Sequence, residues 1–298
     1  MHTLSTAVAA SGPAHRARRG LAIYLAVVAA LTAPLQALIV AADLDGGANG
    51  AGAWLALIAP LMFVPAVASV VARLALREGF ADVSFRLGGR RGRVAVLLAL
   101  AFPLAIGLPA YGVAWATGLV GFAPPPLVGW VVTFVVGSIL TVVLAAGEEI
   151  GWRGYMLTRL IDAGVPRPVL ASGLIWGAWH LPLVLWAGYA AGPSPLLAAA
   201  LFLVAITATG FVYARLRLAT GSVWPAIALH TAWDAIIQTG FDPATTGGQK
   251  ALWTGESGLL TALALVVAAV IVSRGRWAVS RTPPPRGTVT ESRTVVRV

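Results

Sequence analysis

Residues 127–147, LVGWVVTFVVGSILTVVLAAG, decide the fold, because they form a long apolar run without a single charged side chain. A helix needs about 20 mostly apolar residues to cross the hydrocarbon core of a bilayer, so this run predicts a membrane-spanning helix. Its apolar residues are continuous rather than alternating, which favours a helix over a barrel strand. Two acidic residues, Glu148 and Glu149, follow the run directly.

Seven further apolar runs have a similar length. They are residues 21–42, 54–72, 94–119, 168–187, 196–214, 222–238 and 258–273. The chain is 58% hydrophobic and 11% charged, whereas a soluble domain carries about 25% charged residues. We therefore predict an all-α, polytopic transmembrane bundle of about eight spans. The complete absence of cysteine excludes a disulfide scaffold, a thiolate metal site and a cysteine nucleophile.

The basic residues give the bundle a predicted orientation. If the N-terminus is inside, 20 of the 21 basic residues fall on the inner side and only Lys250 falls outside. The inner residues are Arg16, Arg18, Arg19, Arg73, Arg77, Arg86, Arg90, Arg91, Arg93, Arg153, Arg159, Arg167, Arg215, Arg217, Arg274, Arg276, Arg281, Arg286, Arg293 and Arg297. This asymmetry predicts cytoplasmic N- and C-termini and a multi-pass protein of the inner (plasma) membrane. Arginines facing an anionic leaflet explain the net charge of +10 without a nucleic-acid partner.

Three regions follow from these patterns. Residues 1–20 are predicted to be a basic cytoplasmic tail, and residues 21–273 the transmembrane domain. Residues 274–298 contain a proline run and are polar, so we predict a disordered basic C-terminal tail.

Five polar residues stand out because they lie in or at the end of the predicted spans: Glu148, Glu149, His180, His230 and Asp234. A charge at mid-bilayer costs about 2.5–3.5 kcal/mol, so such residues usually have a shared functional reason. The directions of their three spans are consistent with a cavity opening toward the cytoplasm. We predict that the five residues converge on that cavity.

The acidic pair belongs to a short helical pattern. Glu149 and Arg153 are four residues apart, which favours an ion pair and leaves Glu148 without a local partner. The alternative is an interfacial anchor, in which both acids contact lipid headgroups.

The two histidines have patterns of their own. Trp176 lies one helical turn before His180 and can pack against its ring; the alternative for His180 is a simple packing role. His230 and Asp234 share one helical face, where they can bind one metal together or orient one another. Their alternative is a buried hydrogen-bonded pair that locks two helices.

These residues resemble three motifs of the CAAX protease and bacteriocin-processing (CPBP) family of intramembrane proteases, also called the Abi family. The family motifs are Glu-Glu-x-x-x-Arg, Phe-x-x-x-His and His-x-x-x-Asn or Asp. Here they read Glu148-Glu149…Arg153, Trp176…His180 and His230…Asp234. The resemblance covers about residues 127–240. Trp176 replaces the usual phenylalanine but keeps an aromatic ring, and Asp234 stands where the prenyl-protein protease branch has asparagine.

The resemblance implies an endopeptidase that hydrolyses a peptide bond of a membrane-associated protein or peptide. It implies Glu148, His180 and His230 as the catalytic core, with Asp234 beside them. In one possible mechanism, these four residues bind a divalent metal such as zinc, and the metal activates a water molecule. In the other, Glu148 and His180 activate water directly, while His230 and residue 234 stabilise the oxyanion. An ionised Asp234 has no proton to donate, which favours the metal or an orienting role toward His230.

The supporting residues in this scheme are Glu149, Arg153 and Trp176. We expect side-chain atoms of Glu148, His180 and His230 to lie within about 4–6 Å of a common point. Two other functions use the same residues. One is a proton- or ion-coupled transporter, and the other is a non-catalytic family member with a bacteriocin-immunity or scaffolding role.

Overall fold

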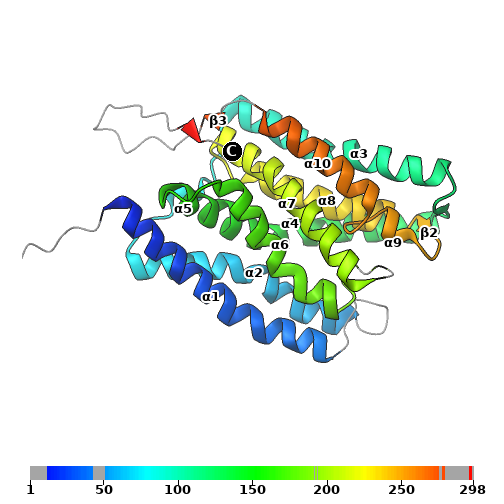
Figure 1. The fold of residues 1–298 in the computed structure, drawn as a ribbon, viewed down its shortest axis with the longest axis horizontal. Helices are drawn as coiled ribbons and strands as arrows, with labels where there is room; N and C mark the ends of the chain where they lie inside the picture. The colour runs from blue at the N-terminus through cyan, green and yellow to red at the C-terminus, as the bar shows by residue number, and fades with distance from the viewer. Residues whose placement is uncertain are drawn as a thin grey trace, which may run out of the picture.

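The structure, a computed structural model, describes residues 12–42, 51–190, 192, 194–274, 277–278 and 295–296. It is a helical bundle, as predicted (Figure 1). The long helices are α1 (Pro13–Ala41), α2 (Ala51–Leu76), α3 (Gly89–Ala116), α4 (Leu127–Gly151), α6 (Pro168–Trp186), α7 (Pro195–Thr220), α8 (Trp224–Trp233) and α10 (Leu259–Ser273). The short ones are the 3₁₀-helix η1 (Ala81–Val83), the π-helices η2 (Trp152–Met156) and η3 (Asp234–Phe241), α5 (Leu157–Asp162) and α9 (Lys250–Trp253).

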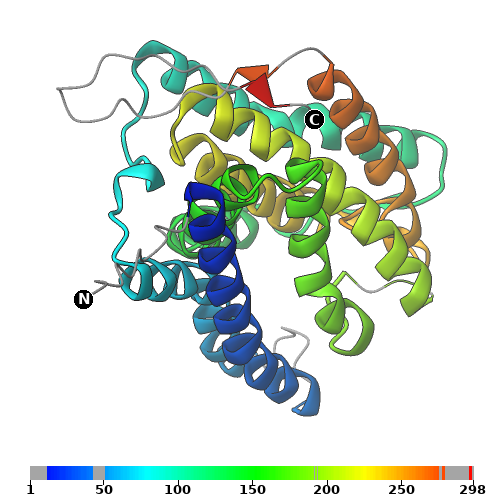
Figure 2. The ribbon, with the colours of Figure 1, turned by 60° about the vertical axis from the view of Figure 1, so that its left-hand side comes forward.

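Six helical segments of the described chain are long and apolar enough to cross a membrane. One of them, 36 residues long, joins α4, η2 and α5 into a single rod. The helix α10 is apolar but shorter, and α8 continues directly into η3. Figure 2 shows the helices gathered into one bundle. The helical membrane bundle is thus confirmed, whereas the count of eight spans and the orientation of the termini stay predictions.

Two predicted boundaries change. The helix α1 begins at Pro13, so the predicted tail 1–20 ends within a helix, and residues 1–11 lie outside the described residues. In the predicted disordered tail, β3 (Trp277–Ala278) pairs with β4 (Val295–Val296) as an antiparallel ribbon. The rest of that tail beyond Arg274 lies outside the described residues.

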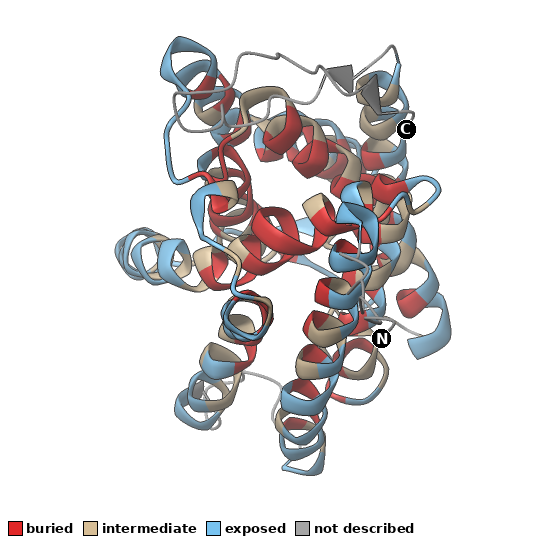
Figure 3. Ribbon diagram, turned by 90° about the vertical axis from the view of Figure 1, so that its left-hand side faces the viewer, coloured by how far each residue is buried: buried red, intermediate tan, exposed pale blue. Residues whose placement is uncertain are grey.

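The outer surface of the bundle is apolar. Large side chains such as Leu97, Val128 and Leu263 are 60–78% exposed, while buried residues gather along the inner faces of the helices (Figure 3). Apolar side chains outside and polar side chains inside are what lipid contact requires, because hydrocarbon offers no hydrogen-bond partners.

Glycines set the spacing of the helices that carry the site. A Cβ atom on Gly151 of α4 would lie 2.4 Å from backbone atoms of Pro65 in α2, and Gly147 is packed against the same helix. Gly173 of α6 and Gly210 of α7 meet in the same way, with a Cβ on Gly210 only 3.2 Å from Cα of Gly173. Small residues at such contacts let the helix backbones approach closely within a membrane.

The rod formed by α4, η2 and α5 differs from the predicted span 127–147. It continues to Asp162, so Glu148 lies about 21 Å from its end, at 1.5 Å per residue. His180 lies about 18 Å from the start of α6 by the same measure. The hydropathy pattern stops at the acidic pair, but the helix does not, because these acids are paired inside the protein.

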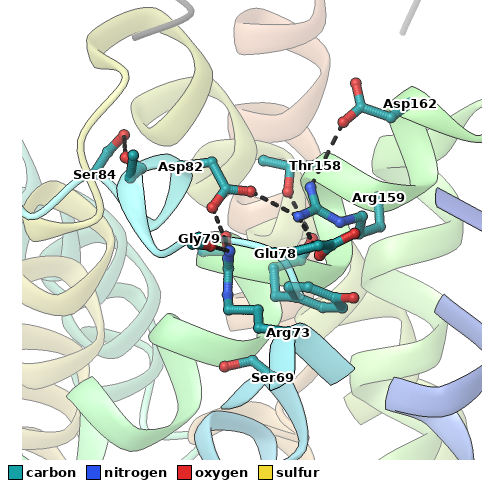
Figure 4. Close-up of polar contacts among 12 residues, drawn as sticks. Ser69, Arg73, Glu78, Gly79, Asp82, Ser84, Thr158, Arg159 and Asp162 are labelled. Atoms are coloured by element: carbon teal, nitrogen blue, oxygen red, sulfur yellow. Dashed lines mark hydrogen bonds and ion pairs between the residues drawn. The ribbon is translucent and has the colours of Figure 1, made fainter. Parts of the chain in front are cut away.

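Ion pairs link several segments at the end of the bundle that carries α5 (Figure 4). Arg159 bonds Glu78 at 2.8 Å and Asp82 at 2.9 Å, and Arg73 also pairs with Asp82. Arg73 is fully buried, Arg159 is 8% exposed and Arg217 4%. These three arginines therefore do not face the lipid headgroups, contrary to the expectation for the basic residues.

Two of these arginines also contact η2. Arg217 donates from Nε to the carbonyl of Arg153 at 3.1 Å, and Arg73 donates from Nη2 to the carbonyl of Gly154 at 3.3 Å. A π-helix is widened by one residue per turn, and η2 follows the acidic pair directly. The arginines thus fix the backbone just beyond the acids.

Candidate functional site

Glu148 is held by two tryptophans from different helices. Its Oε2 accepts a hydrogen bond from Nε1 of Trp176 at 2.9 Å and from Nε1 of Trp152 at 3.2 Å. The side chain is 2% exposed, so it does not reach lipid headgroups. The sequence analysis was wrong to leave Glu148 without a local partner, because Trp152 is four residues further along the same rod.

Glu149 binds two cationic or potentially cationic side chains. Arg153 donates to its Oε1 at 2.8 Å, which confirms the predicted i,i+4 pair, and Nδ1 of His230 bonds the same oxygen at 2.9 Å. The guanidinium of Arg153 lies 3.8 Å from the ring centre of Trp176 and 4.2 Å from that of Tyr213. Arg153 is thus buried between two aromatic rings, which excludes the interfacial-anchor alternative.

The His180 ring is buried, and one of its two nitrogens makes a hydrogen bond to the backbone. Its Nδ1 lies 2.9 Å from the carbonyl oxygen of Trp176. A carbonyl only accepts, so Nδ1 carries the proton and Nε2 of the neutral ring is left as an acceptor. The ring is 8% exposed and does not face lipid.

Trp176 is the residue that joins these groups. Its ring centre lies 5.7 Å from that of His180 and 5.9 Å from that of His230, and its Nε1 binds Glu148. The replacement of the family phenylalanine by tryptophan therefore adds a hydrogen bond, besides keeping the aromatic ring. The convergence of Glu148, His180 and His230 on one point within 4–6 Å stays a prediction.

Asp234 begins η3, and its partner is not the expected one. Its Oδ2 is 3.9 Å from Nε2 of His230, which is beyond hydrogen-bond distance, so Glu149 rather than Asp234 orients this histidine. Asp234 instead accepts a hydrogen bond from Nε2 of Gln238 at 3.3 Å. The same amide nitrogen donates to Glu256 at 3.1 Å.

Glu256 was missed by the sequence analysis. It accepts from Nε1 of Trp233 at 2.8 Å and lies just before α10. The only signal in the sequence was an acidic residue two positions before an apolar run, which is common at helix starts.

A small cavity lies among these side chains, with a volume of about 40 Å³. A water molecule needs roughly 10–15 Å³ of such space, so the cavity has room for a few waters and no more. We call it the reaction cavity. Its polar lining consists of Trp176, His180, Tyr189, Thr209, Tyr213, His230, Trp233, Asp234 and Glu256. Glu148 lies behind Trp176, outside this lining.

The donor set does not fit the metal considered above. Among the described residues, no three His, Asp or Glu side chains are grouped closely enough to bind one metal ion. Glu148 accepts from two indoles, and Glu149 is engaged by Arg153 and His230. We therefore derive no step through a metal ion.

Fold and site together define the class. The chain is an integral membrane protein of apolar helices with acids and histidines buried around a water-sized cavity.

Residues 124–236 match the family described as type II CAAX prenyl endopeptidase Rce1-like. The matched segment runs from just before α4 into η3 and includes every motif residue, so this part of the chain is similar to a peptidase family. No curated protein matches the chain.

Proposed function

We propose that the protein is a metal-independent intramembrane endopeptidase that cuts a membrane-associated protein or peptide. The observation that supports this proposal best is the arrangement around Trp176. One indole ring contacts Glu148, His180 and His230, which come from three separate helices, beside a cavity sized for water.

In the proposed reaction, a water molecule in the reaction cavity attacks the carbonyl carbon of the scissile peptide bond. Nε2 of His180 takes a proton from that water, and the negative charge of Glu148 stabilises the imidazolium that forms. When the tetrahedral intermediate collapses, the C–N bond breaks and this proton passes to the leaving amine. The products are one carboxylic acid and one amine, so the reaction consumes one water.

His230 is proposed to stabilise the oxyanion. Its Nδ1 bonds Glu149, which fixes the ring, and the His230 side chain lines the reaction cavity. Protonated on both nitrogens, the ring presents Nε2–H to the developing negative charge. Asp234, on the same side, then favours the cationic form of the ring by its own charge.

The test uses purified protein in detergent with two substrates, a farnesylated CAAX peptide and an unmodified transmembrane peptide. We expect Glu148→Gln to reduce the cleavage rate at least 100-fold, because it removes the charge but keeps the shape. The matched control is Asp162→Asn, which removes a carboxylate near the far end of the same rod and should leave the rate unchanged. Thermal unfolding of both variants confirms that they are folded.

Cleavage by Glu148→Gln at the wild-type rate would overturn the role of Glu148. Loss of activity on chelator treatment, restored by zinc, would overturn the metal-independent mechanism. If no peptide is cut but proteoliposomes take up protons or ions in a manner that needs His180 and His230, the transporter is the correct function. If neither occurs, the non-catalytic role remains.

A further inference from the structure

A second cavity adjoins the reaction cavity. It has a volume of about 270 Å³ and shares two lining residues, Tyr189 and Glu256, with the reaction cavity. The remaining lining includes the polar side chains of Gln238, Asp242 and Lys250. We call this second cavity the vestibule.

Tyr189 and Glu256 separate the two cavities. The ring of Tyr189 stacks on His180, with centres 6.1 Å apart and planes at 24°. Burial raises the pKa of the Tyr189 hydroxyl well above its ordinary value, so this hydroxyl stays neutral. The two residues common to both linings are thus a neutral phenol and a carboxylate.

The strand β1 (Gly121–Phe122) pairs with β2 (Thr245–Thr246) in an antiparallel ribbon. The vestibule lies at the end of the bundle that carries this ribbon and α9. Figure 1 shows this end opposite the one that carries α5 and β3. At the α5 end, the ion pairs of Arg159 join the rod to Glu78, just after α2, and to Asp82 of η1.

The α9 end and the α5 end of the bundle also differ in their number of basic residues. Among the described residues, Lys250 is the one basic residue at the α9 end, whereas the arginines lie toward the α5 end or, like Arg153, within the bundle. Basic residues are retained on the cytoplasmic side of a membrane. The α9 end, with its vestibule, is therefore expected on the other side. This is opposite to the cytoplasmic opening that the sequence analysis expected.

We infer that the substrate enters through the vestibule, as a polar stretch of polypeptide on the non-cytoplasmic side of the membrane. This inference rests on the proposed function and adds the route and the substrate class to it. Gln238, Asp242 and Lys250 in this lining can bond the peptide groups and charged side chains of such a stretch, whereas an apolar lipid chain offers them no partner.

The chain has no cysteine, so a single introduced cysteine is the only thiol that a labelling reagent can modify. Its reaction then reports the accessibility of that one position. Ala251→Cys places a thiol in the vestibule lining. Gly248→Cys is the matched control, because it is exposed at the same end but lies outside the lining. Arg90→Cys is exposed at the arginine-rich start of α3 and reports the opposite side.

Bacterial cells that express each full-length variant are treated with a membrane-impermeant maleimide, before and after permeabilisation. We expect Ala251→Cys and Gly248→Cys to react in intact cells and Arg90→Cys only after permeabilisation. Peptide cleavage by each purified variant is then compared before and after labelling. Labelling should lower cleavage at least tenfold for Ala251→Cys and leave it unchanged for Gly248→Cys.

Reaction of Ala251→Cys only after permeabilisation would overturn the inferred side. Labelling without loss of cleavage would overturn the vestibule as the entrance. Failure of the unmodified protein to cut either peptide would count against the proposed function alone, because the labelling of intact cells reports the side independently of activity.

Discussion

The buried pair of Glu149 and Arg153 makes a quantitative prediction. The Nη1–Oε1 distance is 2.8 Å and both side chains are at most 2% exposed. At an effective dielectric constant of about 20, two unit charges at this distance attract by about 6 kcal/mol. Removing one partner of a buried pair typically costs about 3–5 kcal/mol, because the other charge is left uncompensated. We expect this loss for Arg153→Met, which keeps an apolar chain between the aromatic rings.

The assay is unfolding of the detergent-solubilised protein, followed by circular dichroism. For a chain of this size, a loss of about 3–5 kcal/mol lowers Tm by roughly 6–20 °C. The double variant Arg153→Met/Glu149→Gln removes both charges. It should be more stable than the sum of the two single losses predicts, by at least about 2 kcal/mol.

The control is the pair Arg159–Asp162, with N and O atoms 3.7 Å apart and Asp162 38% exposed. Its coupling should be below about 1 kcal/mol, as for other half-exposed pairs. If the losses for Arg153 and Glu149 add within about 0.5 kcal/mol, the reasoning from burial and distance is refuted.

Three further predictions concern single residues. Trp176→Phe keeps the ring but removes the donor to Glu148, so the free energy of unfolding should fall by about 1.5–3 kcal/mol; unchanged denaturation would show that this bond contributes nothing. Gly151→Ala places a methyl group against Pro65 and should cost about 1–3 kcal/mol, measured in the same way, with equal stability contradicting the close contact. Burial raises the pKa of Asp242 from 3.8 to about 6, so the native state keeps a proton that the unfolded chain releases first. Stability of the wild type should therefore fall as the pH rises from about 4 to 6, by on the order of 3 kcal/mol, and Asp242→Asn should lack this fall; parallel pH profiles of the two proteins would refute the assignment.

The helical bundle was predictable because lipid imposes a simple rule: long apolar runs become helices. Predicted and observed spans agree closely at α6, where residues 168–187 were expected and Pro168–Trp186 is found. Local spacing also sufficed for Glu149 and Arg153, since residues four apart share a helical face.

Contacts between distant helices were not predictable in this way. The bond between Glu149 and His230 joins residues 81 positions apart, and i,i+4 spacing pointed to Asp234 instead. Glu256 entered the site through a loop whose path no local pattern encodes. The end of the rod was misplaced because hydropathy treats every acid as solvent-seeking, although Glu148 is satisfied inside the protein by two indole donors.

The π-helix η2 has a consequence for the rod as a whole. One additional residue in a helical turn rotates everything beyond it by about 100° relative to a uniform α-helix. Glu149 can therefore point at His230 while Arg159 points at Glu78, although a regular helix would give these two side chains a different angular offset. The length of the chain between the two acids and Arg159, and not only its composition, determines whether both sets of bonds can form at once.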